Sequence, residues 1–588
     1  MASTDRDAEN LGKQFDDILL RIYGNGRYQK FVVALVLLPA IAAQSFLVSG
    51  FVFVIAAPPH WCKLPFERNA NHSHDTHLMN ATDVDFKALL PRNPEDNSTE
   101  KCQKYNVDYT ELLTEWKTLD SLAAHFDNAT SNGILNTTAC DSWVYDHSVY
   151  HDTIVTDWDL VCHQDFLPTL AYILSAFGTV IGTPIGGYLS DLIGRKKTYL
   201  LFLANQVIFS AASAGSPYAF YGFYIFVILN IIQALSVNNT YLTPSTLGME
   251  IITPGFRATY MVLVSVAYTV GGVASTGIAY LFRSWRTYVL VSNLPFLAYA
   301  VYWWIMPESP RWLLSRDRYD DLEAFLKRAA KMNHVDYNES LKCQFKQLCD
   351  QAKSARIKEP GVTAHQREYS YLDLFRTPQI RKQTLLMIIL NTVCQICYNG
   401  LSYYAPSLGS NPYLSSFLAS IVELPAALFT EIICDRIGRR PTIVLCFVLG
   451  GASCLATLGL PTEHAIYAAV LTLFLFAKLF VSSAYIVQEL IQNEILPTVV
   501  RGKGVALSNF IASIATNIGP VIVYLGYKDS SLTLVVFGGI MIFASICAMF
   551  LPETLNLALP ETLAECEENG KISSWKDFPF WNHIKGKL

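Results

Sequence analysis

Long segments without a charged residue are the strongest constraint on this chain. Residues 31–59, 384–422 and 505–527 contain no Asp, Glu, Lys or Arg. A transmembrane helix needs about 20 consecutive, mostly apolar residues, so each segment is long enough to span a bilayer. Only 16% of the whole chain is charged, against about 25% in soluble domains. The sequence therefore predicts an integral membrane protein.

Apolar segments of this length form two sets of six. The first set lies near residues 31–55, 167–189, 198–217, 219–246, 258–282 and 287–306, and the second near 383–405, 412–434, 441–460, 465–490, 504–526 and 531–551. We therefore expect an all-α membrane protein with an N-terminal segment (1–30), an N-terminal bundle (31–306), a central linker (307–382), a C-terminal bundle (383–552) and a tail (553–588). Helical periodicity at 320–331 predicts short interfacial helices in the linker, with a solvated linker as the alternative.

Basic residues predict how the helices cross the membrane. They gather in the connections after the second and eighth predicted helices, as Arg195, Lys196 and Lys197, and as Arg436, Arg439 and Arg440. Because short basic loops face the cytoplasm, both termini and the central linker are expected inside. Residues 57–165 are then expected outside.

Residues 57–165 have two features of an extracellular loop. They contain five Asn-x-Ser/Thr glycosylation sites, at Asn71, Asn80, Asn97, Asn128 and Asn136. They also contain four cysteines, Cys62, Cys102, Cys140 and Cys162, which predict two disulfides whose pairing the sequence leaves open. Both features predict a multi-pass glycoprotein of the plasma membrane.

An internal repeat relates the two sets of helices. The segment 191–196, Asp-Leu-Ile-Gly-Arg-Lys, recurs 244 residues later as Asp-Arg-Ile-Gly-Arg-Arg. Glu250 and Arg257 recur at the same offset, and Pro307-Glu308 recurs as Pro552-Glu553. Three matches in register indicate two parallel six-helix repeats, an arrangement typical of transporters.

The repeated charges predict a gate at the cytoplasmic end. Arginine binds carboxylates bidentately, so these residues can latch the two helix bundles together on one side of the membrane. The predicted gating residues are Asp191, Arg195, Glu250 and Arg257, with Asp435, Arg439, Glu494 and Arg501 in the second half. The alternative is that the basic residues only anchor the loops on the cytoplasmic side.

Several motifs resemble a known family. Residues 187–196, Gly-Tyr-Leu-Ser-Asp-Leu-Ile-Gly-Arg-Lys, are similar to the signature of the major facilitator superfamily. The segments 156–162 (Thr-Asp-Trp-Asp-Leu-Val-Cys), 307–314 (Pro-Glu-Ser-Pro-Arg-Trp-Leu-Leu) and 493–498 (Asn-Glu-Ile-Leu-Pro-Thr) resemble its organic cation, anion and zwitterion transporters, as do the Leu-Pro-Glu-Thr sequences at 551 and 559. The resemblance covers residues 15–562 and implies a twelve-helix transporter fold with an organic-ion substrate.

Ionisable residues within a predicted span are costly and mark a functional site. Glu423 lies in the middle of the eighth span, with Glu431 nearer the cytoplasm, and Lys478 and Glu489 lie in the tenth. Three acids against one base favour a cation as substrate. As alternatives, Glu431 and Glu489 belong to the cytoplasmic gate, and Lys478 only neutralises a nearby acid.

The resemblance adds residues to this site and marks departures from the family. Glu423 matches a glutamate of the family's cation carriers, while Tyr398 and Tyr241 match aromatic residues that contact substrate, where a ring face can bind a cation. Ser513 occupies a position where cation carriers commonly have Asp and anion carriers Arg. The missing Asp is compatible with a distinctive amine or a zwitterion.

The predicted function is secondary transport of small organic cations, such as amines and quaternary ammonium compounds, by alternating access. The alternatives are an organic anion or carnitine-like zwitterion carrier, or a receptor or scaffold that does not transport. No Gly-x-x-x-x-Gly-Lys-Ser/Thr motif for ATP occurs. We expect no enzymatic activity, cofactor, catalytic residue, metal site or nucleic-acid partner. The expected partners are the lipid bilayer, the organic substrate and, as an open point, a coupling ion.

Overall fold

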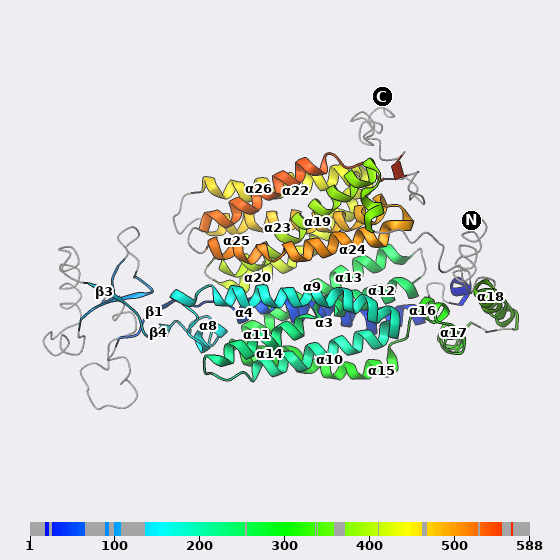
Figure 1. Cartoon of the computed structure of the whole chain (residues 1–588), viewed down its shortest axis with the longest axis horizontal. Coiled ribbons are helices and arrows are strands. Elements are labelled where there is room, and N and C mark those ends of the chain that lie inside the picture. Colours follow the sequence, from blue (N-terminus) through cyan, green and yellow to red (C-terminus); the bar gives the residue numbers. More distant parts are fainter. Residues whose placement is uncertain are drawn as a thin grey trace, which may run out of the picture.

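The computed structural model shows a long bundle of helices with one smaller structured region at each end (Figure 1). The residues it describes are 18–22, 26–64, 89–92, 99–107, 136–252, 256–335, 337, 339–357, 371–409, 411–460, 467–526, 530–555 and 566–567. We call the end that carries the strands the loop end, and the opposite end, where residues 310–357 lie, the linker end.

The N-terminal bundle contains six membrane-length segments, several of which are interrupted. In chain order they are α2 (Arg27–Val32), η1 (Val33–Leu37), α3 (Leu38–Ser49) and α4 (Phe51–Val54); α9 (Leu167–Ile193); α10 (Arg195–Ala214); α11 (Tyr221–Ala234) and α12 (Val237–Ile251); α13 (Arg257–Leu281); and α14 (Trp285–Asn293), η5 (Leu294–Val301) and α15 (Tyr302–Ile305).

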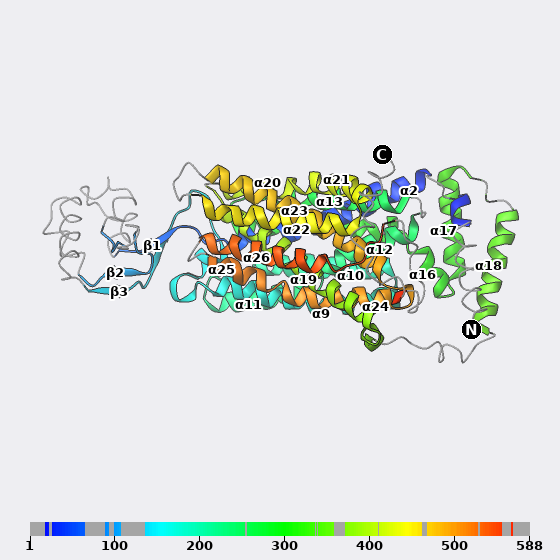
Figure 2. The same cartoon turned by 90° about the horizontal axis from the view of Figure 1, so that it is seen from above.

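The C-terminal bundle repeats this pattern. Its segments are α19 (Pro378–Tyr404) with η8 (Ala405–Ser407); α20 (Pro412–Ile421) and α21 (Glu423–Ile437); α22 (Arg439–Ala456) with η9 (Thr457–Gly459); α23 (Tyr467–Ile495); α24 (Thr498–Ala515) and α25 (Ile518–Gly526); and α26 (Ser530–Ala548). Figure 1 shows the two bundles side by side along their lengths, and Figure 2 gives the perpendicular view.

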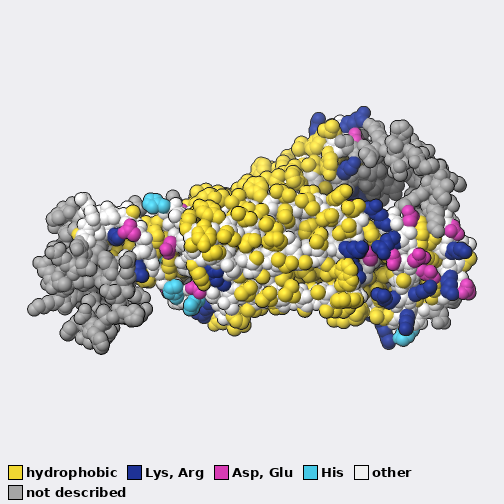
Figure 3. All heavy atoms as spheres, turned by 60° about the horizontal axis from the view of Figure 1, so that its bottom comes forward, with side chains coloured by type: hydrophobic (Ala, Val, Ile, Leu, Met, Phe, Trp, Pro, Cys, Tyr) yellow, Lys and Arg dark blue, Asp and Glu magenta, His cyan; other side chains and the backbone are white. Residues whose placement is uncertain are grey.

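Within the described residues, ten helices are long and apolar enough to cross a membrane. The two remaining segments are α10, whose first turn carries Arg195, Lys196 and Lys197, and the shorter apolar helix of α26. Hydrophobic side chains cover the middle of the molecule in Figure 3, while charged side chains gather toward its two ends. This surface fits a bilayer around the bundle, so the prediction of an all-α membrane protein is confirmed.

Proline explains three of the helix interruptions. A proline lacks an N–H and cannot bond the carbonyl four residues before it. Pro39 follows the π-helical η1, and the free Leu35 carbonyl accepts a hydrogen bond from the Tyr302 hydroxyl at 3.3 Å. Pro425 in the same way cannot bond the Ile421 carbonyl at the junction of α20 and α21. Pro520 likewise cannot bond the Thr516 carbonyl, between α24 and α25, and this carbonyl instead accepts a hydrogen bond of 3.0 Å from the backbone N–H of Gly519.

Short strands and helices lie outside the bundle. At the loop end, β1 (His60–Cys62) pairs antiparallel with β4 (Trp143–Tyr145), and β2 (Gln103–Tyr105) pairs with β3 (Thr137–Ala139). They precede α8 (Ile154–Asp157) and η3 (Cys162–Gln164). At the linker end lie α16 (Pro310–Ser315), α17 (Tyr319–Asn333) and α18 (Glu339–Ile357), followed by η7 (Tyr371–Phe375). The predicted linker helices are therefore present.

Candidate functional site

A cavity of about 110 Å³ lies between the two bundles. Residues of α3, α4, α9 and α13 line one side, and residues of α19, α20, α21 and α23 line the other. Its charged residues are Glu423 and Lys478, and its other lining groups include Tyr172, Tyr268 and several serines and threonines. The cavity is thus polar and is shared by both halves of the molecule.

Glu423 and Lys478 form an ion pair in this cavity. The Lys478 Nζ lies 3.1 Å from the Glu423 Oε1, and their side chains are 1% and 16% exposed respectively. The Tyr398 hydroxyl donates a hydrogen bond of 2.7 Å to the same Glu423 oxygen. The structure therefore brings together three predicted site residues and pairs Lys478 with Glu423.

The interruption between α20 and α21 places Glu423 in the cavity. Val422 joins the two helices, so Glu423 is the first residue of α21. Ser416 and Ser420, four residues apart on α20, line the cavity together with Glu423. This spacing puts the three side chains on one face of the segment.

The other predicted site residues lie outside the cavity lining. Tyr241 packs its ring against Tyr268, which does line the cavity, with the centroids 5.8 Å apart. Ser513 is half-buried in α24 and is not among the lining residues. Glu431 and Glu489 are exposed, and no ion pair of either is present in the described part of the chain.

Sequence reasoning missed the hydroxyl-bearing residues of the cavity. Ser45 and Ser49 on α3 are four residues apart, and Thr269 and Thr276 on α13 are seven residues apart. Polar residues repeated at helical spacing within apolar segments were the available signal. They supply acceptors and donors around the ion pair.

Contacts between the bundles gather at the loop end. Tyr413 of the C-terminal bundle packs against Phe53, Tyr150 and Tyr280, with centroid distances of 5.3, 5.8 and 5.6 Å. Its hydroxyl donates a hydrogen bond of 3.2 Å to the Val149 carbonyl. These contacts join the two bundles at the loop end.

Three further contacts involve Tyr524 and Tyr172. The Tyr524 hydroxyl donates a hydrogen bond of 2.8 Å to Asp165, and its ring packs on Phe166 at 5.2 Å. Nearer the cavity, the rings of Tyr172 and Tyr403 are 4.4 Å apart. All three contacts join opposite bundles.

At the linker end, the predicted gating residues of the first half interact within their own bundle. Arg195 donates two hydrogen bonds to Glu250, from Nε at 3.1 Å and from Nη2 at 3.0 Å. The Arg195 Nη1 also lies 3.1 Å from the Asp191 carboxylate, which is 73% exposed. The side chain of Arg257 lies outside the described residues. Arg195 therefore connects the start of α10 to the end of α12.

The second half repeats this network with looser geometry. Arg439 lies 3.1 Å from Asp435 and 3.5 Å from Glu494. Glu494 also accepts a hydrogen bond from the Thr554 hydroxyl. Arg501 instead donates to the Leu496 carbonyl at 3.1 Å. In this conformation the ion pairs of these residues join helices of one bundle.

Sequence analysis identified Glu308 and Glu553 as repeat positions within family-like segments, without a role of their own, and the structure gives them one. The Glu308 carboxylate accepts hydrogen bonds from the backbone N–H groups of Arg195 and Lys196, at 2.8 and 3.2 Å. Burial raises the pKa of Glu308, although these hydrogen bonds oppose the shift. Glu553 accepts equivalent bonds from Arg439 and Arg440. Each acid thus caps the N-terminus of a helix.

The glycine before each capped helix makes room for the acid. Gly194 and Gly438 have φ values of +100° and +102°, where glycine is favoured. A Cβ at Gly194 would lie 2.3 Å from the Glu308 carboxylate, and one at Gly438 would lie 2.5 Å from that of Glu553. The repeated glycines and acids therefore form one structural unit.

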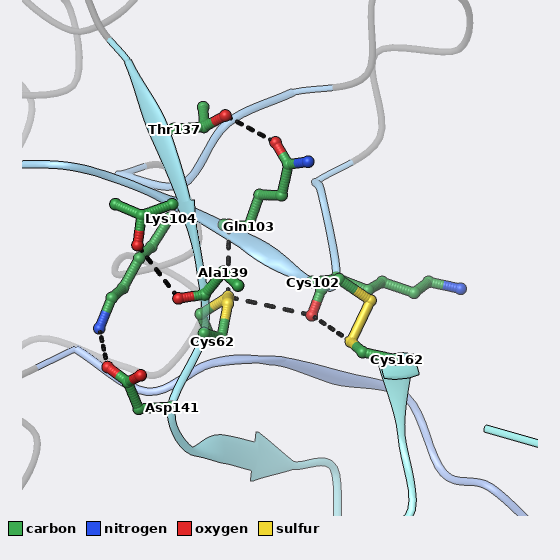
Figure 4. Close-up of a disulfide and its surroundings, with 11 residues drawn as sticks. Cys62, Cys102, Gln103, Lys104, Thr137, Ala139, Asp141 and Cys162 are labelled. Carbon is green, nitrogen blue, oxygen red and sulfur yellow. Dashed lines mark hydrogen bonds and ion pairs between the residues drawn. A yellow bond between two sulfur atoms is a disulfide. The ribbon is translucent and has the colours of Figure 1, made fainter. Parts of the chain in front are cut away.

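The loop end contains two disulfides, which pair Cys62 with Cys140 and Cys102 with Cys162. Figure 4 shows the second of these beside β2 and β3. The predicted glycosylation sites Asn71, Asn80, Asn97 and Asn128 lie outside the described residues, whereas Asn136 is exposed next to β3.

A buried ion pair fixes the loop end to the N-terminal bundle. Asp157 accepts hydrogen bonds from Arg286 Nε at 3.0 Å and from the Trp285 indole at 2.9 Å. Arg286 Nη1 also donates to the carbonyls of Ala214 and Ser216. The Trp158 indole donates to the Pro217 carbonyl at 3.0 Å. The end of α8 is thereby held against α14 and the end of α10.

The charged cavity between two related bundles defines a secondary transporter of the major facilitator type. Residues 117–564 match the family model described as "Sugar (and other) transporter". The chain is 31% identical to the Drosophila melanogaster beta-alanine transporter, with 94% of this chain and 89% of that protein covered. It is 32% identical to the carcinine transporter of the same species (96% and 80% covered) and 30% identical to its organic cation transporter protein (95% of each).

The protein belongs to the organic cation, anion and zwitterion transporter family of the major facilitator superfamily. The fold is also that of the inward-open xylose transporter XylE from E. coli, at a TM-score of 0.54 and 18% identity over 69% of this chain and 89% of that one. The predicted family and fold are confirmed, and so is the prediction of a transporter that is not an enzyme.

Proposed function

We propose that this protein carries small organic cations across the plasma membrane by alternating access, with Glu423 as the counter-charge for the substrate. The main support is the position of Glu423, which is a carboxylate lining a cavity shared by both bundles. The hydrogen bond from the Tyr398 hydroxyl to the Glu423 carboxylate holds the Glu423 side chain in place. Relatives named for organic cation transport agree with this substrate class.

The loop end is proposed to face the cell exterior, and the linker end with both termini to face the cytoplasm. The basic residues at the linker end support this orientation. The disulfides at the loop end agree with it, because disulfides persist in oxidising compartments. The structure then corresponds to a state in which substrate in the cavity is separated from the exterior.

The test is uptake of a labelled quaternary amine by cells that express the protein, beside uptake of a labelled carboxylate. Glu423→Gln keeps the size of the side chain but removes its charge, so amine uptake should fall at least about tenfold, as expected for about 1.4 kcal/mol of lost binding. Surface expression should stay unchanged. Equal amine uptake by the variant and the wild type would remove Glu423 from the site.

A zwitterionic substrate is the second candidate, because the cavity contains an ammonium as well as a carboxylate. A compound with both charges has a partner for each in Lys478 and Glu423. The relatives named for beta-alanine and for organic cation and carnitine transport support this class. Competition between labelled quaternary amine and unlabelled beta-alanine or carnitine distinguishes the two candidates.

A further inference from the structure

Lys478 occupies a complete ammonium-binding site. Its Nζ lies 3.1 Å from the Glu423 carboxylate and donates hydrogen bonds to the Ser402 hydroxyl at 2.7 Å and the Tyr398 carbonyl at 3.4 Å. It also lies 3.7 Å from the centroid of the Tyr398 ring. An ammonium has three donors, and here three oxygen acceptors and one aromatic face surround it.

The same groups would bind the ammonium of a free ligand. A carboxylate supplies charge-assisted hydrogen bonds, and an aromatic face attracts a cation within about 6 Å of its centroid. Because Lys478 already makes these contacts, the carboxylate is not free to attract an external cation. A substrate must either replace this ammonium or bind beside it.

We propose that Lys478 is an internal ligand of the amine site, which the substrate ammonium displaces from Glu423. The displaced Lys478 ammonium then becomes the partner of a carboxylate on the same substrate. This inference rests on the second, zwitterionic candidate of the proposed function and specifies its substrate as a small compound with both an ammonium and a carboxylate, such as a short ω-amino acid.

Charge balance favours such a compound over a simple cation. Lys478 and Glu423 together carry no net charge, so an added cation leaves one positive charge without a partner in a buried site. An unpaired buried charge is costly. A zwitterion adds no net charge and offers each member of the pair a new partner.

The size of the cavity agrees with a small substrate. Its volume of about 110 Å³ is below the roughly 300–1,000 Å³ of sites for drug-sized ligands. The Ser416 hydroxyl lines the same cavity and has no hydrogen-bond partner among the described residues, so it can donate a hydrogen bond to a carboxylate. Both observations fit a compound of few heavy atoms with two polar ends.

Transport by Lys478→Met tests the exchange of partners, with tetramethylammonium and beta-alanine as labelled probes. Without the competing ammonium, the concentration of tetramethylammonium for half-maximal uptake should fall about tenfold, equivalent to about 1.4 kcal/mol. The concentration of beta-alanine for half-maximal uptake should instead rise by a similar factor, because its carboxylate no longer has a partner. The control is Lys478→Arg, which retains the charge and should keep the order of preference of the wild type. A similar decrease in the uptake of tetramethylammonium and of beta-alanine by Lys478→Met would overturn the proposal.

Chemical rescue tests the internal ligand without measuring transport. Lys478→Ala leaves space beside Glu423, so n-butylammonium should raise the melting temperature of the purified variant more than that of the wild type. The control Glu423→Gln/Lys478→Ala lacks the carboxylate and should gain no such increase. An equal increase in both variants would refute the ammonium site. Absence of amine uptake by the wild type would instead refute the proposed function, so the two failures remain distinguishable.

Discussion

The Glu308 carboxylate accepts a hydrogen bond of 2.8 Å from the backbone N–H of Arg195, so an acid that follows the sixth span caps the helix that forms the third. Glu553 and Arg439 repeat this relationship at 2.9 Å in the second half. The repeated Pro-Glu and Gly-Arg sequences are therefore two parts of one contact. They tie the third and sixth spans of each bundle together at the linker end.

Removing this cap should destabilise the protein. In Glu308→Ala, the N–H groups of Arg195, Lys196 and Ser309 lose their acceptor. A buried donor without a partner costs about 1–3 kcal/mol, so the melting temperature of the purified protein should fall. Glu323→Ala is a control, because it removes an exposed ion pair with Lys327 and should cost less than about 1 kcal/mol. Equal melting temperatures of the two variants would contradict the cap.

The two acids around Arg195 should contribute unequally to the gate. Glu250 is 18% exposed and binds Arg195 through two hydrogen bonds, whereas Asp191 is 73% exposed. Exposed pairs are worth about 0–1 kcal/mol and hydrogen bonds to charged groups about 1.5–3 kcal/mol. Glu250→Gln should therefore lower thermal stability and transport rate more than Asp191→Asn does.

The comparison of Glu494→Gln with Asp435→Asn repeats this test in the second half. Glu494 is 20% exposed and Asp435 is 72% exposed, but the Arg439–Glu494 distance is 3.5 Å. Glu494→Gln should thus also lower thermal stability and transport rate more than Asp435→Asn does, but by a smaller margin than in the first half. If the aspartate variants lower stability and transport rate more than the glutamate variants in both halves, the unequal contribution of the two acids is refuted.

Tyr413→Ala should open the loop end. The substitution removes ring contacts with Phe53, Tyr150 and Tyr280, and aromatic pairs are worth about 0.5–1.5 kcal/mol each beyond their buried area. A cysteine placed at the cavity residue Ser420 should then react several times faster, about fivefold for about 1 kcal/mol, with a membrane-impermeant thiol reagent added outside.

Tyr413→Phe is the matched control for this experiment. It keeps the ring and loses only the hydrogen bond to the Val149 carbonyl. Its labelling rate should lie close to that of the wild-type background. An unchanged rate in Tyr413→Ala would show that this side chain does not close the cavity.

The Asp157–Arg286 pair should be a determinant of folding at the loop end. Asp157→Ala leaves the Arg286 charge without its carboxylate in a site where the two side chains are 9% and 16% exposed. Breaking such a pair costs about 3–5 kcal/mol, so less protein should reach the cell surface.

The double variant Asp157→Ala/Arg286→Met separates charge from packing. It removes both charges and should recover part of the surface expression lost in Asp157→Ala, because no unpaired charge remains. Asp152→Ala, at an exposed pair with His151, should resemble the wild type. A double variant as poorly expressed as Asp157→Ala would argue against the unpaired charge as the cause.

The sequence by itself determined the spans, the repeat and three members of the central site. Apolar segments of membrane length have few ways to satisfy their backbone other than as helices, and α9, α13 and α26 lie within a few residues of the predicted ranges. Glu423 and Lys478 were identifiable because charges within apolar segments are costly and rare. Pairing of Lys478 with a nearby acid was one of the alternatives that the sequence left open, and the structure identifies that acid as Glu423.

Tertiary structure alone decided which residues meet. Segments distant in sequence are joined by four kinds of contact. These are the four contacts of Lys478, the packing of Tyr413 against three aromatic rings, the two disulfides, and the capping of a helix by Glu308. Tyr241 and Ser513 occupy suitable spans but lie outside the cavity lining, because the direction of a side chain depends on how its helix packs. Hydropathy records the length and burial of a segment, whereas contacts follow from the packing of whole helices against one another.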